Sequence, residues 1–334
     1  MKKGMIAIDI GSSNTKIYRL GAGVVLCEPS VVAVAAGEKR TVKAVGIDAK
    51  KLIGKTAEHT SIVCPIVEGA VVSERMAVEM LSSFLKKVQS SERVSYALVT
   101  VPCGLGEAEQ YRLGMALKGA GISHYTFVQN PVCAALGMNV PLTEESPCFI
   151  VDMGGGITNI AALSLDGIIA GLSLSLGGSN IDAQLIDYIA FHERMKIGLL
   201  TAERLKQQIG SLIAGDSTQT VVNGRDIETG RPRSIALSSS DIYEPMKLYF
   251  DKVVEVVRMV LSKLPAEVSA EISRTGIMVT GGTSKVPGMA EYLSHKDRLD
   301  MPVTVADAPE LSAVIGAGAV CGNKDLLKTI KTSF

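Results

Sequence analysis

One pattern occurs twice in this chain and limits what the chain can fold into. AIDIGSSNTKIYRL at residues 7–20 and VDMGGGITNIAAL at residues 151–163 each join an apolar run ending in Asp to a second apolar run through a glycine turn. β-Branched and alternating residues on both sides of a turn are typical of strand–turn–strand hairpins. The repeat therefore predicts two related α/β halves. The pairs that match at one constant offset are Asp9 with Asp152, Gly11 with Gly154, Thr15 with Thr158, Ile17 with Ile160 and Leu20 with Leu163.

The size and composition of the chain agree with two such halves. A chain of 334 residues can form roughly two domains, each with its own core. With 47% hydrophobic and 20% charged residues, it has the composition of a compact globular protein. Basic and acidic residues both number 34, so no overall charge attracts nucleic acid or anionic lipid, and we expect no nucleic-acid partner.

Cysteine and histidine usage argues against a metal centre built on these residues. The six cysteines and four histidines are scattered, and no C-x-x-C pair occurs, so neither a zinc site nor a disulfide framework is indicated. The cysteines are typical of small buried hydrophobes in a reducing compartment. No apolar run is long enough to span a bilayer, and MKKGMIAIDIG shows no signal-peptide pattern. We therefore expect a cytoplasmic protein.

The segments outside the two repeats alternate between helical and strand patterns. SERMAVEMLSSFLKKVQ at 73–89 has apolar residues at helical spacing. VVAVAAGEKRTVKAVGIDAKKLIG at 31–54 predicts a hairpin and a short helix, and the dipeptide Asn223-Gly224 predicts a hairpin turn within 220–228. Other expected helices are 106–121, 180–195, 201–213 and 241–264, and other expected strands are 96–102 and the start of 276–282.

The repeated turn has the chemistry of a phosphate site. Turn N–H groups can donate to phosphate oxygens, glycine lets the backbone approach closely, and an Asp can hold Mg²⁺ through its water shell. Two such turns facing each other would clamp one polyphosphate. A single copy would favour an ordinary hairpin, but a second copy in register favours a site. No G-x-x-x-x-G-K-[ST] P-loop occurs, and strand alternation rather than a helix follows Gly154-Gly155-Gly156, which argues against a Rossmann turn.

Motifs along almost the whole chain resemble the actin and Hsp70-type ATPase superfamily, especially its rod-shape-determining MreB branch. The resemblance implies an actin-like ATPase fold, in which two duplicated RNase H-like α/β domains surround a nucleotide cleft. Residues 1–140 and 314–334 would form domain I, with a small subdomain at about 31–65. Residues 141–313 would form domain II, with a small subdomain at about 180–240. The matching segments are DIGSSNT at 9–15, EPSVVAV at 28–34, VGIDAKKLIGKT at 45–56, PIVEGAV at 65–71, NPVCAALG at 130–137, DMGGGITN at 152–159, GGSNID at 177–182, TAERLKQQIG at 201–210 and TGGTSKVPGM at 280–289.

The same resemblance implies ATP or ADP with Mg²⁺ as cofactors and assigns their site. The two Asp side chains, Asp9 and Asp152, would place Mg²⁺ through water. Glu203 and Lys206 would hold the ribose and adenine, although their spacing alone favours a solvated i,i+3 ion pair. Thr283 stands where the family has a third glycine. The phosphate loops comprise Asp9, Gly11, Ser12, Ser13, Asn14 and Thr15, then Asp152, Gly154, Gly155, Gly156 and Thr158. The remaining residues are Gly177 and Gly178 at a helix start that could face the phosphates, and Gly281, Gly282 and Thr283 beside the adenine and α-phosphate.

The segment NPVCAALG departs from the MreB pattern at its first residue. MreB relatives typically have Glu there, and this Glu orients or activates the attacking water. Asn130 can hydrogen-bond a water, but it cannot act as a general base at neutral pH and is one methylene shorter. Actin has a Gln at the corresponding place, so an amide is compatible with hydrolysis. We hypothesise that the chain binds ATP with Mg²⁺ and hydrolyses it slowly, with Asn130 and Thr158 as the catalytic candidates.

Membrane contact is left open by the sequence. MreB relatives reach lipid through an amphipathic N-terminal helix or a hydrophobic loop, but the corresponding loop here, QSSERVS at 89–95, is polar. The tail KDLLKTIKTSF at 324–334 has apolar residues near one helical face among lysines, which fits either a helix docked on its own domain or weak membrane contact. The apolar residues are Leu326, Leu327, Ile330 and Phe334.

The leading functional hypothesis is a nucleotide-switched filament. ATP would bridge the two halves, and its state would set their angle and the affinity of head-to-tail contacts with further copies of the chain. The resemblance favours a role in cell shape, with membrane-bound cell-wall synthesis machinery as a partner. The alternative is an Hsp70-like or pilus-adaptor-type ATP-binding protein that does not form filaments. A sugar or acid kinase on the same fold is a third class, but no segment supplies its catalytic Asp.

Overall fold

Two five-stranded sheets organise the part of the chain that the computed structural model describes, which is residues 4–35, 37, 41–55, 59–88, 94, 96–140, 146–164, 167–323 and 325–328. The first sheet has the order β10-β9-β1-β2-β3 and the second the order β13-β12-β11-β17-β18. The strands of the first sheet are β1 (Met5–Ile10), β2 (Asn14–Arg19), β3 (Gly23–Pro29), β9 (Tyr96–Val101) and β10 (Tyr125–Gln129). Those of the second are β11 (Cys148–Met153), β12 (Thr158–Ser164), β13 (Gly167–Leu174), β17 (Ile277–Thr280) and β18 (Val303–Val305).

The two sheets have the same connectivity, and their first hairpins have the same register, which confirms the duplicated fold. In each, the first three strands form an antiparallel meander, and the first strand also pairs in parallel with a later strand. In the first hairpin Asp9 lies opposite Lys16, and in the second Asp152 lies opposite Asn159. The offset found in the sequence therefore superimposes one hairpin on the other.

Strand alternation turns both aspartates toward the interface between the halves. In β1, Ile6, Ile8 and Ile10 pack into a core with the helices α2 (Glu74–Val88) and α3 (Glu107–Gly119), while Ala7 faces the other side. In β11, Val151 packs with α7 (Tyr243–Leu261), while Ile150 faces the other side. Because side chains alternate along a strand, Asp9 shares the face of Ala7, and Asp152 shares the face of Ile150.

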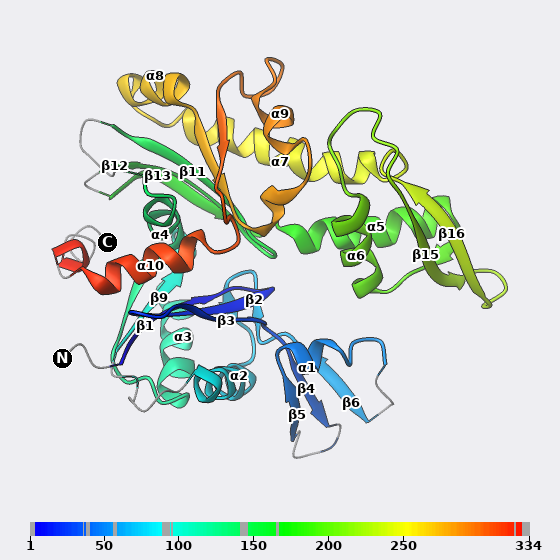
Figure 1. Ribbon diagram of the computed structural model, residues 1–334, viewed down its shortest axis with the longest axis horizontal. Helices are drawn as coiled ribbons and strands as arrows, with labels where there is room; N and C mark the ends of the chain where they lie inside the picture. Colours follow the sequence, from blue (N-terminus) through cyan, green and yellow to red (C-terminus); the bar gives the residue numbers. More distant parts are fainter. Residues whose placement is uncertain are drawn as a thin grey trace.

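Two helices rich in alanine and glycine fill the space between the sheets. α4 (Asn130–Gly137) and α10 (Ser312–Gly322) form one apolar cluster with the inner faces of both sheets, as seen between them in Figure 1. The helices are in backbone contact, since a Cβ atom on Gly137 would lie 1.9 Å from the carbonyl oxygen of Ser312. A Cβ atom on Gly316 would lie 1.8 Å from the carbonyl oxygen of Cys133. The two halves are therefore held together by a close-packed helix pair.

Each half also carries a small sheet beside the space between the halves. In the first half, β4 (Val32–Ala35), β5 (Val42–Val45) and β6 (Thr60–Val63) pack with α1 (Ile47–Lys50). The expected hairpin and short helix are therefore joined by a third strand. In the second half, β14 (Met195–Lys196), β15 (Gln219–Asp226) and β16 (Pro232–Ser238) lie beside α5 (Gly178–His192) and α6 (Leu199–Ile209). The remaining elements are β7 (Ile66–Val67), β8 (Ala70–Val71), α8 (Ala266–Thr275), the 3₁₀ helix η1 (Gly282–Lys285) and α9 (Met289–Ser294).

Two local predictions were wrong. Asn223-Gly224 does not form a turn, because both residues lie within β15, where Gly224 pairs with Arg233 and passes close to the backbone of β14. The turn follows Asp226, whose side chain accepts hydrogen bonds from the backbone N–H groups of Glu228 and Thr229. α6 ends at Ile209 rather than at residue 213, and the backbone N–H of Leu212 then donates to Pro287.

The described part of the tail packs on the protein. Leu326 and Leu327 lie against the apolar cluster of α4 and α10, as expected for a tail docked on its own domain. Ile330, Phe334 and most of the 89–95 loop lie outside the described residues. Within the described ranges, no helix is both long enough and apolar enough to cross a membrane.

The backbone contact between α4 and α10 predicts a strong effect of one methyl group. We expect Gly316→Ala to force the two helices apart and to lower the free energy of unfolding by about 1–3 kcal/mol. Gly198→Ala is the matched control, since a Cβ atom there meets no atom within 4 Å. Urea unfolding measures both variants. Equal stability of Gly316→Ala and the wild type would contradict the close packing.

Candidate functional site in the cleft

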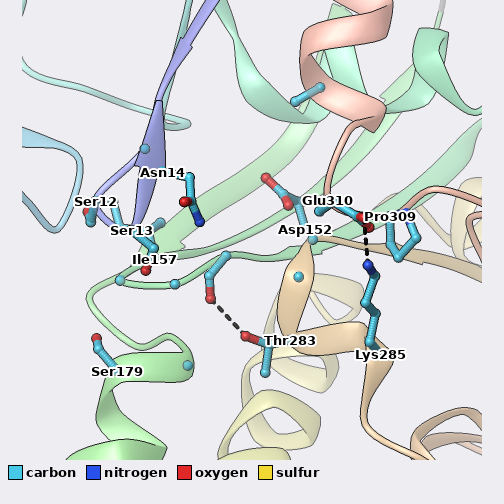
Figure 2. Close-up of a pocket in the computed structure, with 18 of the residues that line it drawn as sticks. Ser12, Ser13, Asn14, Asp152, Ile157, Ser179, Thr283, Lys285, Pro309 and Glu310 are labelled. Carbon is cyan, nitrogen blue, oxygen red and sulfur yellow. Dashed lines mark hydrogen bonds and ion pairs between the residues drawn. The ribbon is translucent and has the colours of Figure 1, made fainter. Parts of the chain in front are cut away.

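A cavity of about 570 Å³ lies between the two halves and is lined by both repeated turns. Its volume is within the range of small-molecule sites. Figure 2 shows Ser12, Ser13 and Asn14 of the first turn close to Ile157 of the second. The predicted site residues that line it are Asp9, Gly11, Ser12, Ser13, Asn14, Asn130, Asp152, Gly154, Gly155, Gly156, Gly178, Glu203, Lys206, Gly281, Gly282 and Thr283.

The two turns touch each other at one end of this cavity. A Cβ atom on Gly155 would lie 1.9 Å from the hydroxyl oxygen of Ser13, and one on Gly156 would lie 2.8 Å from that of Ser12. Each turn closes in the same way, with the N–H of its first glycine donating to the residue three positions later. The backbone N–H groups and hydroxyls gathered here can serve as donors to an anion.

Asp9 is paired with a lysine from the neighbouring strand. The ammonium of Lys16 lies 2.7 Å from Asp9 Oδ2, and the Thr100 hydroxyl donates to Asp9 Oδ1 over 2.9 Å. Burial lowers the pKa of Lys16, but the charge of Asp9 and its hydrogen bond outweigh burial, so that the pKa is raised and the lysine stays charged. Sequence reasoning missed Lys16, although the hairpin register places it opposite Asp9.

Asp152 has amide partners where Asp9 has a lysine. Asn159 donates to Asp152 Oδ2 over 3.1 Å, and Asn130 donates to the same oxygen over 3.3 Å. Burial and the charge of Asp9 raise the pKa of Asp152 to about 6, and the hydrogen bonds from the amides only partly oppose this. The two hairpins are therefore alike in geometry but different in charge. A cation beside Asp152 would stabilise its ionised carboxylate, as Lys16 does for Asp9.

Asn130 lines the cavity, and one of its two side-chain polar atoms has no hydrogen-bond partner in the described structure. It is the first residue of α4, and its amide nitrogen donates to Asp152. Its carbonyl oxygen Oδ1 is buried and has no hydrogen-bond partner within the described structure. This oxygen can accept a hydrogen bond from a water, but it cannot take a proton at neutral pH.

Glu203 and Lys206 both line the cavity, but they do not form the i,i+3 ion pair that their spacing alone favours. Lys206 pairs with Asp182 over 2.8 Å and donates to the carbonyl oxygen of Gly178 over 2.7 Å. Glu203 pairs with Lys50 of α1, whose ammonium lies 2.7 Å from Glu203 Oε2. Because α1 belongs to the other half, this ion pair joins α1 of one half to α6 of the other. Figure 1 shows these two helices beside the small sheets of their halves.

Three predicted site residues do not line the cavity. Thr15 is buried and its hydroxyl lies 2.9 Å from that of Ser30. Thr158 is also buried, and its hydroxyl donates to the carbonyl oxygen of Leu176 rather than facing the cavity. A catalytic role for Thr158 stays a prediction. Gly177 packs behind Gly155.

The backbone N–H groups at the start of α5 donate hydrogen bonds to the second turn and are not free to face the cavity. The helix begins at Gly178 rather than at residue 180. The N–H of Gly178 donates to the carbonyl oxygen of Gly154 over 3.0 Å, and that of Ser179 donates to Gly155 over 2.7 Å. The first two N–H groups of the helix are therefore used to position the turn.

One wall of the cavity, beside the second turn, is formed by η1 and the segment before α10. The Thr283 hydroxyl donates to the carbonyl oxygen of Gly154 over 3.0 Å, so the residue in place of a third glycine also supports the second turn (Figure 2). Lys285 pairs with Glu310 over 2.6 Å at the cavity wall. Sequence reasoning missed this pair.

The buried charge of Asp152 predicts a stability gain on its removal. A folded-state pKa of about 6, above the usual 3.8, means that ionisation costs stability as the pH rises through this interval. We expect Asp152→Asn to raise the free energy of unfolding by about 2 kcal/mol above pH 7, because the asparagine oxygen can still accept from Asn159. Below pH 4 the gain should vanish.

Urea unfolding between pH 4 and pH 8 measures this difference. Asp307→Asn removes an exposed carboxylate and serves as the control. A variant Asp152→Asn that is less stable than the wild type at pH 8 would contradict the assignment of a costly buried charge.

Comparisons with known proteins identify the family of this chain. The family model described as MreB/Mbl protein matches residues 3–329. The chain is 34% identical to the cell shape-determining protein MreB of Escherichia coli strain K12, over 94% of this chain and 92% of that protein. It is 30% identical to the cell shape-determining protein Mbl of Bacillus subtilis strain 168, over 98% of each.

Solved structures show the same fold. MreB5 of Spiroplasma citri bound to ADP has a TM-score of 0.91 and 27% identity, and covers 99% of each chain. A chain of the MamK double helical filament has a TM-score of 0.78 and 21% identity, over 96% of this chain and 98% of that one, and shows the fold alone. On the family match and the identity to its relatives, this chain belongs to the MreB/Mbl family of actin-like proteins.

Proposed function

We propose that this chain is an ATP-binding actin-like protein that polymerises into filaments and organises cell shape and cell-wall synthesis from the cytoplasm. The observation that carries the proposal is the pair of equivalent turns, one from each half, that touch at one end of a single cavity. The related MreB5 of Spiroplasma citri has been solved with ADP and with AMPPNP. A non-filament adaptor of the Hsp70 type is not favoured, since the MreB/Mbl match spans nearly the whole chain.

The residues of the cavity suit a polyphosphate with Mg²⁺. We assign the β- and γ-phosphates to the backbone N–H groups and hydroxyls of the two turns, with Lys16 as the nearby cation. Within the described residues, no group of three His, Cys, Asp or Glu could hold a metal directly. Asp9 and Asp152 instead fit a cation that keeps most of its waters, as Mg²⁺ does. When bound, Mg²⁺ would neutralise phosphate charge and favour the ionised form of Asp152.

The sugar and base would lie toward α6 and η1. Glu203 and Lys206 line this part of the cavity, and we assign them to the ribose and its neighbouring groups. Both side-chain oxygens of Glu203 lie within 2.8 Å of Lys50, so the residue assigned to the ribose also carries the bridge between the two halves. Binding of a nucleotide is thereby coupled to the contact between the two halves.

Self-association is the proposed means of function, and cell-wall synthesis machinery is the proposed partner. The names of the relatives describe them as cell shape-determining. Leu326 and Leu327 pack on the protein itself, which favours a docked tail over lipid contact by these two residues.

Electron microscopy with ATP and Mg²⁺ tests the function. We expect filaments from the wild type and none from Asp152→Asn, which keeps the fold but loses the carboxylate for the cation. Absence of polymers from the wild type over a range of protein and salt concentrations would contradict the filament assignment. Equal polymerisation of both proteins would contradict the role of the cavity.

The amide at Asn130 predicts slow hydrolysis. We expect little phosphate release from the wild type, and faster release from Asn130→Glu, by about tenfold or more, because a general base contributes roughly 10²–10⁴-fold when it is well placed. Asn130→Gln is the matched control, since it adds a methylene without adding a base. Equal and fast release from the wild type and Asn130→Glu would overturn the hypothesis.

The Lys50–Glu203 bridge predicts faster nucleotide exchange when it is removed. Both side chains are partly exposed, with 33% and 27% of their surface accessible, so the pair contributes at most about 1 kcal/mol, or roughly fivefold in rate. We expect Lys50→Met to raise association and release rates of a fluorescent ADP analogue several-fold, with less change in Kd.

Lys51→Met is the control for this measurement, because Lys51 pairs with Asp48 in its own segment and does not cross the cleft. Stopped-flow fluorescence gives both rates. Unchanged rates in Lys50→Met would show that the bridge does not restrain the cleft.

A further inference from the structure

The side chain of Asn159 links Asp152 to the other half of the protein. Asn159 lies opposite Asp152 in the second hairpin, lines the cavity and is 2% exposed. Its amide nitrogen donates to Asp152 Oδ2 over 3.1 Å, and its carbonyl oxygen Oδ1 accepts from the backbone N–H of Cys103 over 3.3 Å. The hydroxyl of Ser173 lies 2.6 Å from the same Oδ1. One buried amide therefore joins a carboxylate of the cavity to a backbone group of the first half.

These partners allow one orientation of the Asn159 amide. The Cys103 N–H is a donor and must meet the carbonyl oxygen, whereas the ionised Asp152 carboxylate only accepts and must meet the amide nitrogen. The reversed amide would place oxygen against oxygen on one side and N–H against N–H on the other. Buried polar groups without a partner are costly. The contact with Cys103 therefore determines which atom of Asn159 faces Asp152.

Cys103 lies in the loop 102–105, which joins β9 to α3 in the first half and contacts β13 of the second half. The hydroxyl of Ser173 in β13 lies 3.0 Å from the carbonyl oxygen of Cys103. A Cβ atom on Gly171, also in β13, would lie 3.1 Å from Cys103 Sγ. Because the loop and the strand belong to different halves, this contact depends on how the halves sit together.

Lys16 fills the equivalent position of the first hairpin. It lies opposite Asp9 and pairs with it over 2.7 Å inside its own half. Asp152 instead accepts from Asn159, which is held by the loop 102–105, and from Asn130 at the start of α4. Asp9 is thus held by its own hairpin, whereas the placement of the Asp152 carboxylate depends on contacts with the first half.

We propose that Asn159 is a positioning residue for the cation of the cleft: it holds the Asp152 carboxylate in place for a hydrated Mg²⁺ while the loop 102–105 lies on β13. The inference rests on the proposed function, because it takes Asp152 to act on Mg²⁺ bound with a nucleotide. Loss of a partner that orients a metal-binding side chain typically lowers metal affinity about 10–100-fold. By linkage, a cation that favours this arrangement also stabilises the contact between the loop and β13.

Calorimetric titration with ADP, in Mg²⁺ and in EDTA, tests the positioning role. The quantity compared is the ratio of the Kd for ADP in EDTA to the Kd in Mg²⁺. We expect Asn159→Ala to lower this ratio by about tenfold and to change the Kd in EDTA by less than about threefold. Ser173→Ala keeps the donor to Asp152 but removes a hydrogen bond to Asn159 Oδ1, and it should lower the ratio by about threefold.

Alkylation of Cys103 tests the link between the halves. Its thiol lies against β13 of the second half, so separation of the halves should expose it. We expect ADP with Mg²⁺ to slow maleimide labelling of Cys103 several-fold in the wild type, and much less in Asn159→Ala. Peptide mass mapping distinguishes Cys103 from the other cysteines.

Asn223→Ala is the matched control. Asn223 is also a strand asparagine whose Oδ1 accepts from a serine hydroxyl, that of Ser234, but it is exposed and does not line the cavity. Circular dichroism melting checks that each variant keeps the fold, and Ser173→Ala carries the test if Asn159→Ala does not fold.

An unchanged ratio of the two Kd values, or an equal loss of ADP affinity in Mg²⁺ and in EDTA, would overturn this inference and leave the proposed function standing. Labelling of wild-type Cys103 at the same rate with and without ADP and Mg²⁺ would overturn the link between the halves. Failure of the wild type to bind ADP in Mg²⁺ would overturn the inference and the proposed function together.

Discussion

The backbone contact between α4 and α10 sets the geometry on which the site depends. These helices lie between the sheets because the inner faces of β1 and β11 carry small or aliphatic residues, and the glycine crossing brings the helix axes close. α4 begins with Asn130 at the cavity wall, and α10 follows directly on the segment that carries Glu310. A rotation of one half against the other would therefore move Asn130 relative to the two turns.

Charge is distributed unequally over two hairpins that are otherwise equivalent. Lys16 balances Asp9, whereas the partners of Asp152 are amides, and this difference leaves a costly carboxylate at the centre of the cavity. A cation or a cation–phosphate complex relieves that cost when it binds. Under the proposed function, the stability lost at Asp152 in the empty cavity would be regained when the cation binds.

The repeated hairpins could be predicted from the sequence because strand alternation and glycine turns are local signals. The register of the first hairpin also places Lys16 opposite Asp9, so a residue-by-residue comparison of the two hairpins would have predicted this ion pair. The dipeptide Asn223-Gly224 led to a wrong prediction of a hairpin turn. Its turn signal is local, whereas strand β15 is determined by pairing with β16. The pairs Lys50–Glu203 and Lys285–Glu310 join residues distant in sequence, so only the packed fold brings them together. Thr158 matched a motif, yet its side chain faces the core.

We propose that the two turns clamp one polyphosphate between the halves. A crystal structure of the protein with AMPPNP and Mg²⁺ tests this arrangement. The β- and γ-phosphates should lie between residues 12–14 and 154–156, with Mg²⁺ within one water of both Asp9 and Asp152. A nucleotide that contacts only one of the turns, or that binds outside the cavity, would contradict the account.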